Sequence, residues 1–293
     1  MKILIPDNME KEVVEKIKNL GDVVYLPQNL DAALADAEVL IVRSQTKVTR
    51  ELLAKAKKLK LVARAGVGLD NVDQRACKER GIKVLNTPGA STESVAELAL
   101  TLVAVLLRKI VQAHTQMKNK ICDKKKLVGK EIKGKTLGII GFGRIGSAVA
   151  ERAHALGMNV LVYNPEPFKS DFAKSVELEN LLRESDVVTL HVPITESTRK
   201  MINKERLALM KNGAYLINTA RGEVVDEDAL YDALKSGKLG GAALDVLGKE
   251  PYDGKLLELD NVVFTSHTGA NTTDAQNRIG EELVARLKEF LRE

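Results

Sequence analysis

Short, continuous apolar runs alternate with amphipathic segments from the first residues of the chain. KILI (2–5), EVLIVR (38–43) and KLVARA (60–65) are apolar runs of strand length, and residues 49–59 between two of them have helical periodicity. Strands that are apolar on both faces and are separated by helices are typical of a parallel sheet covered on both sides. The pattern predicts a doubly wound α/β domain near the N-terminus.

The same alternation resumes at residue 135. Between the two alternations, we expect one long helix from about Thr92 to Gln116, and after them a closing helix from about Asp274 to Leu291. Because the closing helix follows the last strand of the second sheet, we expect it to return to the first domain. The predicted strands of the second part are KTLGII (135–140), NVLVY (159–163), DVVTLHV (186–192), AYLINTA (214–220), GAALDV (241–246) and NVVFTS (261–266).

The chain is therefore predicted to form two doubly wound parallel-sheet α/β domains with a cleft between them. The first comprises residues 1–90 plus 270–293, and the second residues 91–269. A cleft flanked by two chain crossings is a common place for a small-molecule site.

Composition narrows the class of protein. Hydrophobic residues make up 44% of the 293 residues but aromatic residues only 3%, so the core is aliphatic and stacking platforms for nucleic acid are not expected. The two cysteines, Cys77 and Cys122, have no partners at motif spacing, and we expect neither a disulfide framework nor a metal site. The longest apolar run (94–107) is interrupted by Glu97 and is too short for a membrane span. We expect a cytoplasmic protein.

Net charge is +5, which mildly favours anionic ligands. Much of the excess lies in one stretch, MKNKICDKKKLVGKEIKGK (117–135). This stretch is either a solvated connector or an arm that brings positive charge to an anionic substrate.

The segment KTLGIIGFGRIGSAVAERAHALGMNVLVYN (135–164) fits one strand–helix–strand unit that binds a dinucleotide. Its G-x-G-x-x-G follows a predicted strand and opens a predicted helix, which is the context that confirms this motif. Gly141 permits the tight turn, Gly143 lets a pyrophosphate approach the backbone, and Gly146 allows the helix to pack closely on the strand. The N-terminus of the helix supplies free N–H groups to the phosphates.

Asn164 stands where dinucleotide-binding domains usually have an acidic residue that binds the ribose, 23 positions after Gly141. An asparagine can still bond to a ribose hydroxyl, but it does not repel a 2′-phosphate. Alternatively, Asn164 is a turn residue before Pro165. We expect NAD as cofactor, with NADP possible because Asn164 replaces the usual Asp.

Three charged side chains follow strands of the second predicted sheet: Arg221, Glu250 and His267. Ligands bind beyond the carboxyl ends of parallel strands, so the three are expected to converge. A histidine is the natural base for the hydroxyl proton of a 2-hydroxy acid, a carboxylate fixes its tautomer, and an arginine fork binds the substrate carboxylate. Each residue alone also has an ordinary structural interpretation, and the prediction depends on all three. His191, at another strand end, is expected to line the cofactor site.

The sequence resembles the D-2-hydroxyacid dehydrogenase family, and within it the D-3-phosphoglycerate dehydrogenases. The resemblance extends over almost the whole chain. Its motifs are VRSQTKVT (42–49), RAGVGLDNVD (64–73), NTPGASTESVAELAL (86–100), GKTLGIIGFGRIG (134–146), NTARGEVVDEDALYDALKSGKLGGAALDV (218–246), KEP (249–251) and HTGA (267–270).

The resemblance implies a flavodoxin-like substrate-binding domain, a Rossmann NAD-binding domain and a set of site residues. Arg221, Glu250 and His267 match the family's catalytic residues. Cofactor contacts are implied for Val67, Gly141, Gly143, Arg144, Ile145, Gly146, Asn164, His191, Val192, Pro193, Thr219, Ala220, Arg221, Asp245, His267, Gly269 and Ala270. Substrate contacts are implied for Arg43, Ser44, Arg64, Val67, Gly68, Arg221 and His267.

Arg43 and Arg64 match arginines that face the substrate phosphate in phosphoglycerate dehydrogenases. Both lie at carboxyl ends of predicted strands, and two guanidinium groups suit a phosphate better than a small neutral tail. The resemblance also implies a homodimer built on the long helix, with Lys124 in a connector that reaches toward the partner. Many relatives continue into a C-terminal regulatory domain whereas this sequence stops at Glu293, so we expect no serine feedback through such a domain.

The expected function is the NAD-dependent oxidation of 3-phospho-D-glycerate to 3-phosphohydroxypyruvate, the entry to serine biosynthesis. The expected ligand is a small anionic 2-hydroxy acid, and no nucleic-acid or membrane partner is expected. Two alternatives stay open from the sequence: a glyoxylate or hydroxypyruvate reductase of the same family, and a nucleotide-sensing binding protein.

Overall fold

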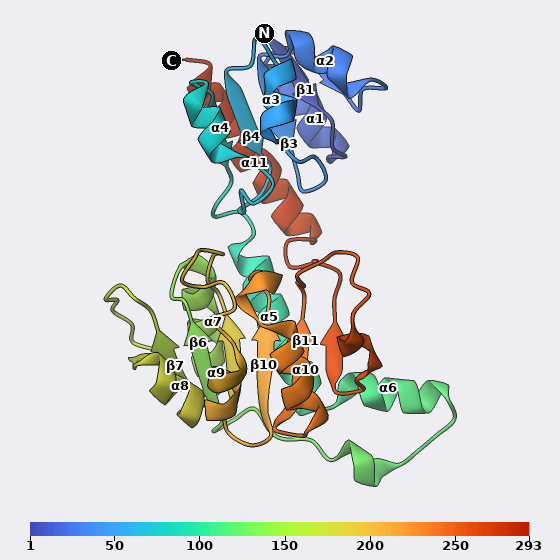
Figure 1. Ribbon diagram of the computed structural model, residues 1–293, viewed down its shortest axis with the longest axis vertical. Coiled ribbons are helices and arrows are strands. Elements are labelled where there is room, and N and C mark those ends of the chain that lie inside the picture. The colour runs from blue at the N-terminus through green and yellow to red at the C-terminus, as the bar shows by residue number, and fades with distance from the viewer. Residues whose placement is uncertain (293) are drawn as a thin grey trace. The chain divides into compact units, whose positions relative to one another are not determined.

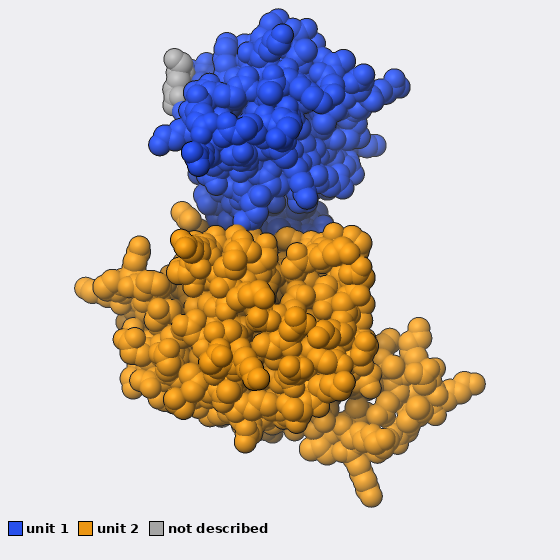
Figure 2. Space-filling view, in the orientation of Figure 1, with its two compact units in different colours: residues 1–92, 270–293 blue, residues 93–269 orange. Residues whose placement is uncertain are grey.

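The computed structural model describes residues 1–292. The chain separates into two compact units, unit 1 with residues 1–92 and 270–293 and unit 2 with residues 93–269, which are coloured separately in Figure 2. Each unit is a parallel sheet covered by helices, as the alternating pattern predicts (Figure 1). No helix in the described part of the chain is long and apolar enough to cross a membrane.

Unit 1 contains a five-stranded parallel sheet in the order β2-β1-β3-β4-β5. This is the flavodoxin-like order, in which the direction of winding reverses between β1 and β3. The strands are β1 (Lys2–Ile5), β2 (Asp22–Tyr25), β3 (Val39–Val42), β4 (Leu61–Arg64) and β5 (Lys83–Asn86).

Helices cover both faces of this sheet. The helices α1 (Lys11–Lys18) and α11 (Thr273–Phe290) bury one face, and α2 (Leu30–Asp36), α3 (Arg50–Lys55) and α4 (Gln74–Glu79) bury the other. The last helix of the chain therefore completes the unit that the first strand begins. A side chain at Gly280 of α11 would lie only 2.2 Å from Val13 of α1, so glycine is required for the two helices to pack this closely.

Unit 2 contains a seven-stranded parallel sheet in the order β12-β11-β10-β9-β6-β7-β8. The first six strands in chain order follow the Rossmann arrangement, and winding reverses between β6 and β9. The strands are β6 (Thr136–Ile140), β7 (Asn159–Tyr163), β8 (Lys174–Ser175), β9 (Val187–Leu190), β10 (Ala214–Asn218), β11 (Leu239–Leu244) and β12 (Val262–Phe264). The two-residue strand β8 was not predicted.

Two groups of helices cover the sheet of unit 2. The helices α5 (Thr92–Leu107) and α7 (Arg144–Ala155) pack on one face, and α8 (Leu178–Glu184), α9 (Lys204–Leu209) and α10 (Glu227–Lys235) pack on the other. Three short 3-10 helices complete the unit: η1 (Lys124–Leu127), η2 (Gly222–Val224) and η3 (Lys255–Glu258).

The expectation of one long helix from Thr92 to Gln116 is wrong. The helix α5 ends at Leu107, Lys109 takes a left-handed backbone conformation with φ of 51°, and a separate helix α6 (Ile110–Lys118) follows. The buried positions of α5 stop at Leu107, whereas no residue of α6 is buried. Burial against the sheet therefore stabilises only the first part of the apolar segment.

Candidate active site

The glycine-rich turn lies where the winding of the unit 2 sheet reverses, between the ends of β6 and β9. Gly141 has φ of +97°, and a Cβ there would lie 2.5 Å from the His191 carbonyl oxygen. A Cβ at Gly146 would lie 2.1 Å from the Gly141 carbonyl oxygen. Both glycines are therefore required by close backbone contacts, which also bring the residues after β9 against the turn.

Gly143 is the N-cap residue of helix α7, and no side chain caps the N-terminus of this helix. A Cβ added at Gly143 would meet nothing within 4 Å, so the space in front of the turn is open. Arg144 and Ile145 form the first turn of α7, whose N–H groups are the donors that suit a phosphate. The residues present therefore fit a dinucleotide pyrophosphate.

His191 follows β9 beside this turn. Its N–H donates to the Ile140 carbonyl oxygen at 2.8 Å, and its Nε2 lies 3.0 Å from the Thr189 hydroxyl. Burial lowers the pKa of the imidazole to about 4, so His191 is neutral at neutral pH. Val192 packs near Gly141, and the Pro193 carbonyl accepts a hydrogen bond from Thr198 at 2.7 Å.

The amide of Asn164 is bonded within the chain. Its Oδ1 accepts from the Phe142 N–H at 2.9 Å, and its Nδ2 donates to the Glu166 carbonyl oxygen at 2.8 Å. The rings of Phe142 and Phe168 lie with centroids 4.1 Å apart. Asn164 thus connects the glycine-rich turn to the loop after β7 by hydrogen bonds. This role is closer to that of a turn residue than to that of a direct ribose ligand.

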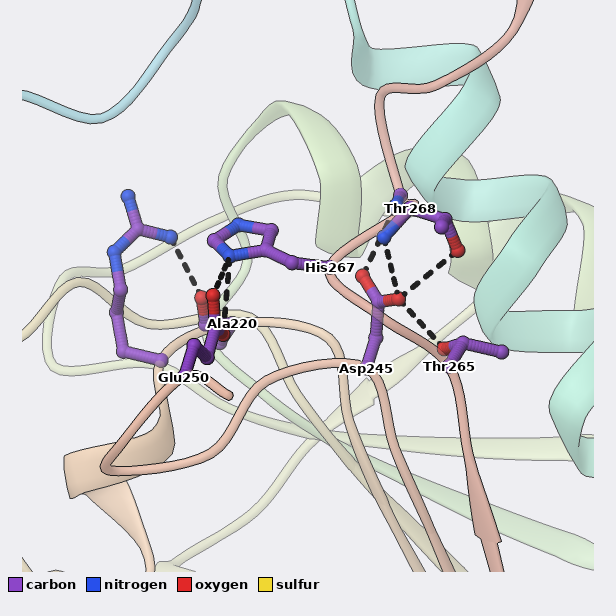
Figure 3. A network of polar contacts seen from close by, with 8 residues as sticks. Ala220, Asp245, Glu250, Thr265, His267 and Thr268 are labelled. Atoms are coloured by element: carbon purple, nitrogen blue, oxygen red, sulfur yellow. Dashed lines mark hydrogen bonds and ion pairs between the residues drawn. The ribbon is translucent and has the colours of Figure 1, made fainter. Parts of the chain in front are cut away.

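His267 and Glu250 form a close pair in unit 2 (Figure 3). The imidazole Nδ1 lies 3.1 Å from Glu250 Oε2 and 3.2 Å from Oε1. The side chains are 49% and 45% exposed, so both are accessible to a ligand. Because a carboxylate only accepts hydrogen bonds, Nδ1 must carry the proton, which leaves Nε2 as an acceptor.

Asp245, directly after β11, organises the loop that carries His267. Figure 3 shows its carboxylate surrounded by Thr265 and Thr268. Oδ1 accepts from the Thr265 hydroxyl at 2.6 Å and the Thr268 N–H at 2.8 Å, and Oδ2 accepts from the Gly269 N–H at 3.0 Å. The Asp245 carbonyl also accepts from the His267 N–H at 2.8 Å. His267 has φ of 54°, and this network holds that unfavourable backbone conformation.

Arg221 lies on the turn after β10, next to the strand that leads to Glu250. Buried Asn218 shapes this turn, because its Nδ2 donates to the Arg221 carbonyl at 2.9 Å and its Oδ1 accepts from the Ala220 N–H at 3.0 Å. The Arg221 Nη1 donates to the Ala220 carbonyl at 2.6 Å. Thr219 is buried, and its hydroxyl has no hydrogen-bond partner among the described residues.

Gly222 brings the loops of Arg221 and Glu250 together. A Cβ at Gly222 would lie 2.0 Å from the Leu247 carbonyl carbon and 2.3 Å from the Gly248 nitrogen. The Gly248 N–H in turn donates to Glu227 at 2.7 Å. This contact fixes the positions of the two loops relative to the ends of the neighbouring strands β10 and β11.

A cavity of about 480 Å³ adjoins the His267–Glu250 pair. Its walls are mostly apolar, formed by Leu247, Pro251, Tyr252, Leu257 and Phe264 together with the polar residues from Thr265 to Thr268. The pair therefore lies at the border of an apolar pocket.

Unit 1 holds the other predicted substrate residues. Arg43 follows β3 and Arg64 ends the neighbouring strand β4, with Val42 and Arg64 in register. Arg64 Nη1 donates to the Ala65 carbonyl at 3.2 Å, and Gly66 takes φ of +140° where any Cβ would clash with this guanidinium. The Val67 carbonyl accepts from Asn86 at 2.6 Å, and Gly68 continues this loop.

The loop Arg43–Thr46, which includes exposed Ser44, is fixed by two polar residues that sequence reasoning missed. Buried Asp7 accepts from the Arg43 N–H at 2.6 Å and from the Thr46 hydroxyl, and Asn71 donates to the carbonyls of Arg43 and Thr46 at 2.8 and 2.7 Å. For Asp7 the signal in the sequence is an Asp just after an apolar run, which marks a candidate for shaping a strand-end loop, whereas Asn71 follows no such run.

The predicted site residues divide between the two units at Gly269 and Ala270. The Gly269 carbonyl accepts from Ser94 at 2.7 Å within unit 2, and the Ala270 carbonyl accepts from Gln276 at 2.8 Å within unit 1. Arg43, Ser44, Arg64, Val67, Gly68 and Ala270 belong to unit 1, and the other predicted residues belong to unit 2.

A Rossmann sheet with an open glycine-rich turn, together with a His–Glu pair at its strand ends, defines a nicotinamide-dependent oxidoreductase. The sequence profile described as "D-isomer specific 2-hydroxyacid dehydrogenase, NAD binding domain" matches residues 100–269. The chain belongs to the D-2-hydroxyacid dehydrogenase family and is an NAD-dependent D-2-hydroxyacid dehydrogenase.

Individual relatives cover almost the whole chain. Hydroxypyruvate reductase of Thermotoga maritima is 47% identical over 98% of this chain and 97% of that protein. D-3-phosphoglycerate dehydrogenase of Methanocaldococcus jannaschii is 45% identical over 100% of this chain, which spans only 58% of that protein. The structure of D-lactate dehydrogenase from Aquifex aeolicus, complexed with NAD and lactic acid, has a TM-score of 0.89 at 37% identity, covering 100% of this chain and 96% of that one.

Proposed function

We propose that this dehydrogenase interconverts 3-phospho-D-glycerate and 3-phosphohydroxypyruvate with NAD as cofactor. The observation that carries this proposal is the placement of Arg43 directly after β3 and of Arg64 at the end of the neighbouring strand β4. Arg43 stands where the winding of the unit 1 sheet reverses, which is the usual ligand-binding position in such sheets. One guanidinium group at this position and a second at the end of the next strand suit a dianionic phosphate.

The proposed chemistry assigns a role to each catalytic side chain. His267 Nε2 takes the proton from the C2 hydroxyl of the substrate, and Glu250 holds the ring by accepting from Nδ1–H. Arg221 binds the substrate carboxylate. When bound, the nicotinamide ring supplies the acceptor for the C2 hydride.

NAD rather than NADP is the proposed cofactor. Asn164 provides no charge against a 2′-phosphate, but exposed Glu166 lies two residues further on. No arginine follows Asn164 directly to bind such a phosphate, while Lys169 stands in the same loop. We expect a preference for NAD that is weaker than an aspartate would give.

The proposed assembly is a homodimer formed through α6 and the lysine-rich stretch. In an isolated chain this region exposes large apolar side chains, which normally mark an interface. They are Ile110, Val111, Met117, Ile121 and Val128. Light scattering tests the assembly: Met117→Glu combined with Ile121→Glu is expected to give monomers, and an unchanged dimer would contradict this interface.

Steady-state rates with 3-phosphoglycerate, glycerate, glyoxylate, hydroxypyruvate and D-lactate, each with NAD or NADP in the appropriate redox form, test the proposed substrate. We expect the phosphorylated substrate to give the highest kcat/KM. Arg43→Ala is expected to lower kcat/KM for 3-phosphoglycerate by at least about tenfold, the effect of losing a charge-assisted hydrogen bond. Retention of full phosphoglycerate turnover in Arg43→Ala would reject the phosphate-binding role.

Hydroxypyruvate reduction is the second candidate. The observation that favours it is the Thermotoga relative, which matches this chain over nearly its full length. The same catalytic residues serve this reaction run toward the hydroxy acid. A wild-type enzyme that turns over hydroxypyruvate more efficiently than 3-phosphohydroxypyruvate would select this candidate.

A further inference from the structure

The guanidinium group of Arg43 is held by two uncharged acceptors. Its Nη2 donates to Gln276 Oε1 at 2.7 Å, and its Nη1 donates to the Asn8 carbonyl oxygen at 3.2 Å. Other arginines of the structure bind carboxylates instead, as Arg50 binds Glu79 and Arg286 binds Glu282. Arg43 is therefore oriented without being neutralised.

Gln276 is itself fixed at both ends of its amide. It lies in the first turn of α11 and is half-buried. Its Oε1 accepts from Arg43, and its Nε2 donates to the Ala270 carbonyl at 2.8 Å. The reverse orientation would set an NH₂ group against a guanidinium and an oxygen against a carbonyl, so the assignment of the two atoms is unambiguous.

The main chain of Arg43 has separate supports. Asp7 accepts from its N–H, and Asn71 donates to its carbonyl oxygen. These contacts fix the main chain of Arg43, whereas Gln276 and Asn8 fix the position of its guanidinium group. A guanidinium has five N–H donors, of which these two contacts use two. Within the described residues 1–292, three donors and the charge of the guanidinium therefore remain for an anion.

We propose that Gln276 is a positioning residue that acts through Arg43 and makes the enzyme selective for substrates with a distal anionic group. This inference rests on the proposed function for the identity of that group, a phosphate. A glutamate at 276 would also accept from Arg43, but it would neutralise the charge that the phosphate needs. A neutral amide is the side chain that orients the guanidinium and leaves its charge available.

The test compares two variants with a matched control in α11. Gln276→Met keeps the side-chain length and removes both hydrogen bonds, Gln276→Glu keeps the acceptor and adds a charge, and Asn277→Met alters the exposed neighbour. We expect Gln276→Met to raise KM for 3-phosphohydroxypyruvate about tenfold, Gln276→Glu to raise it further, and Asn277→Met to leave it unchanged. The ratio of kcat/KM for 3-phosphohydroxypyruvate to that for hydroxypyruvate should fall in the same order. A wild-type KM in Gln276→Glu would overturn the requirement for a neutral amide.

A double-mutant cycle with Arg43→Ala separates positioning from a general structural effect. If Gln276 acts through Arg43, Gln276→Met changes KM by less than about twofold once Arg43 is absent. The same factor in both backgrounds would overturn the inference, and thermal melting of all variants verifies that they fold. Failure of the proposed function is seen separately, in a wild type that prefers hydroxypyruvate. The cycle is measured on 3-phosphohydroxypyruvate in that case too, because hydroxypyruvate has no distal anionic group, and additive effects there still reject positioning.

Discussion

The imidazole Nδ1 of His267 lies 3.1 Å from a carboxylate oxygen of Glu250, although 16 residues separate the two in the chain. Glu250 lies in the loop after β11 and His267 in the loop after β12. The contact between Gly222 and Leu247 holds the loop after β10 against the loop after β11. The pair fixes the ring so that Nε2 is the free acceptor.

Removing either member of this pair should impair turnover. We expect His267→Ala to lower kcat by on the order of 10² to 10⁴-fold, because a general acid–base group is lost. Glu250→Gln should lower it by less, because the ring stays in place but loses the charge that stabilises its protonated form. Asp253→Asn, an exposed carboxylate in the same segment, is the control. Full turnover in His267→Ala would reject its assignment as the base.

Asp245 should matter for stability as well as for turnover. An amide at this position cannot accept from both the Thr265–Thr268 side and the Gly269 N–H, so Asp245→Asn leaves one buried donor unpaired. We expect a loss of about 1.5 to 3 kcal/mol in the free energy of unfolding, measured with urea, and a lower kcat because the loop carries His267. Asp260→Asn, which is exposed, should change neither. Equal stability of the Asp245→Asn protein would show that the network is dispensable.

Asn164→Asp should sharpen the choice of cofactor. The carboxylate can still accept from the Phe142 N–H but cannot donate to the Glu166 carbonyl, and its charge repels a 2′-phosphate. We expect the NAD-to-NADP ratio of kcat/KM to rise roughly tenfold. Asn164→Ala removes both hydrogen bonds and should raise KM for NAD severalfold, because the glycine-rich turn is no longer bonded to the loop after β7. A wild type that strongly prefers NADP would contradict the cofactor proposal.

His191 should make the protein less stable in mild acid. Burial lowers the pKa of the folded-state imidazole to about 4, below the ordinary 6.5, so only the unfolded chain takes up a proton as the pH falls below 6.5. The stabilising contribution is complete above pH 6.5 and is lost progressively toward pH 4. The free energy of unfolding is measured with urea at pH 7 and at pH 5. Its decrease between the two pH values should be about 2 kcal/mol larger for the wild type than for His191→Gln. Parallel pH profiles for the two proteins would contradict an imidazole that stays neutral in the folded protein.

The sequence is sufficient to predict every strand except the two-residue β8, and the residues at the carboxyl ends of the predicted strands. Apolar runs and a glycine-rich turn are local signals, so Arg221, Glu250 and His267 could be assigned to strand ends before their contacts were known. The break between α5 and α6 could not be predicted, because Lys109 takes a left-handed conformation without a glycine to signal it.

The polar residues that support the site depend on contacts between distant parts of the chain. Gln276 reaches Arg43 from a helix more than 200 residues away, and its position on that helix is not distinguished by local pattern. Asn164 directly follows β7, but its bond to the Phe142 N–H follows from the exact path of the turn rather than from spacing.

The chain order of the two units has a consequence for synthesis on the ribosome. Unit 2 is complete once residue 269 has emerged, but one face of the unit 1 sheet is covered only by α1 until Ile279, Leu283 and Leu287 of α11 have been made. While the whole second unit is translated, the first 92 residues therefore expose the apolar surface of the sheet that α11 later covers. The core of unit 1 therefore cannot be completed before the whole of unit 2 has been synthesised.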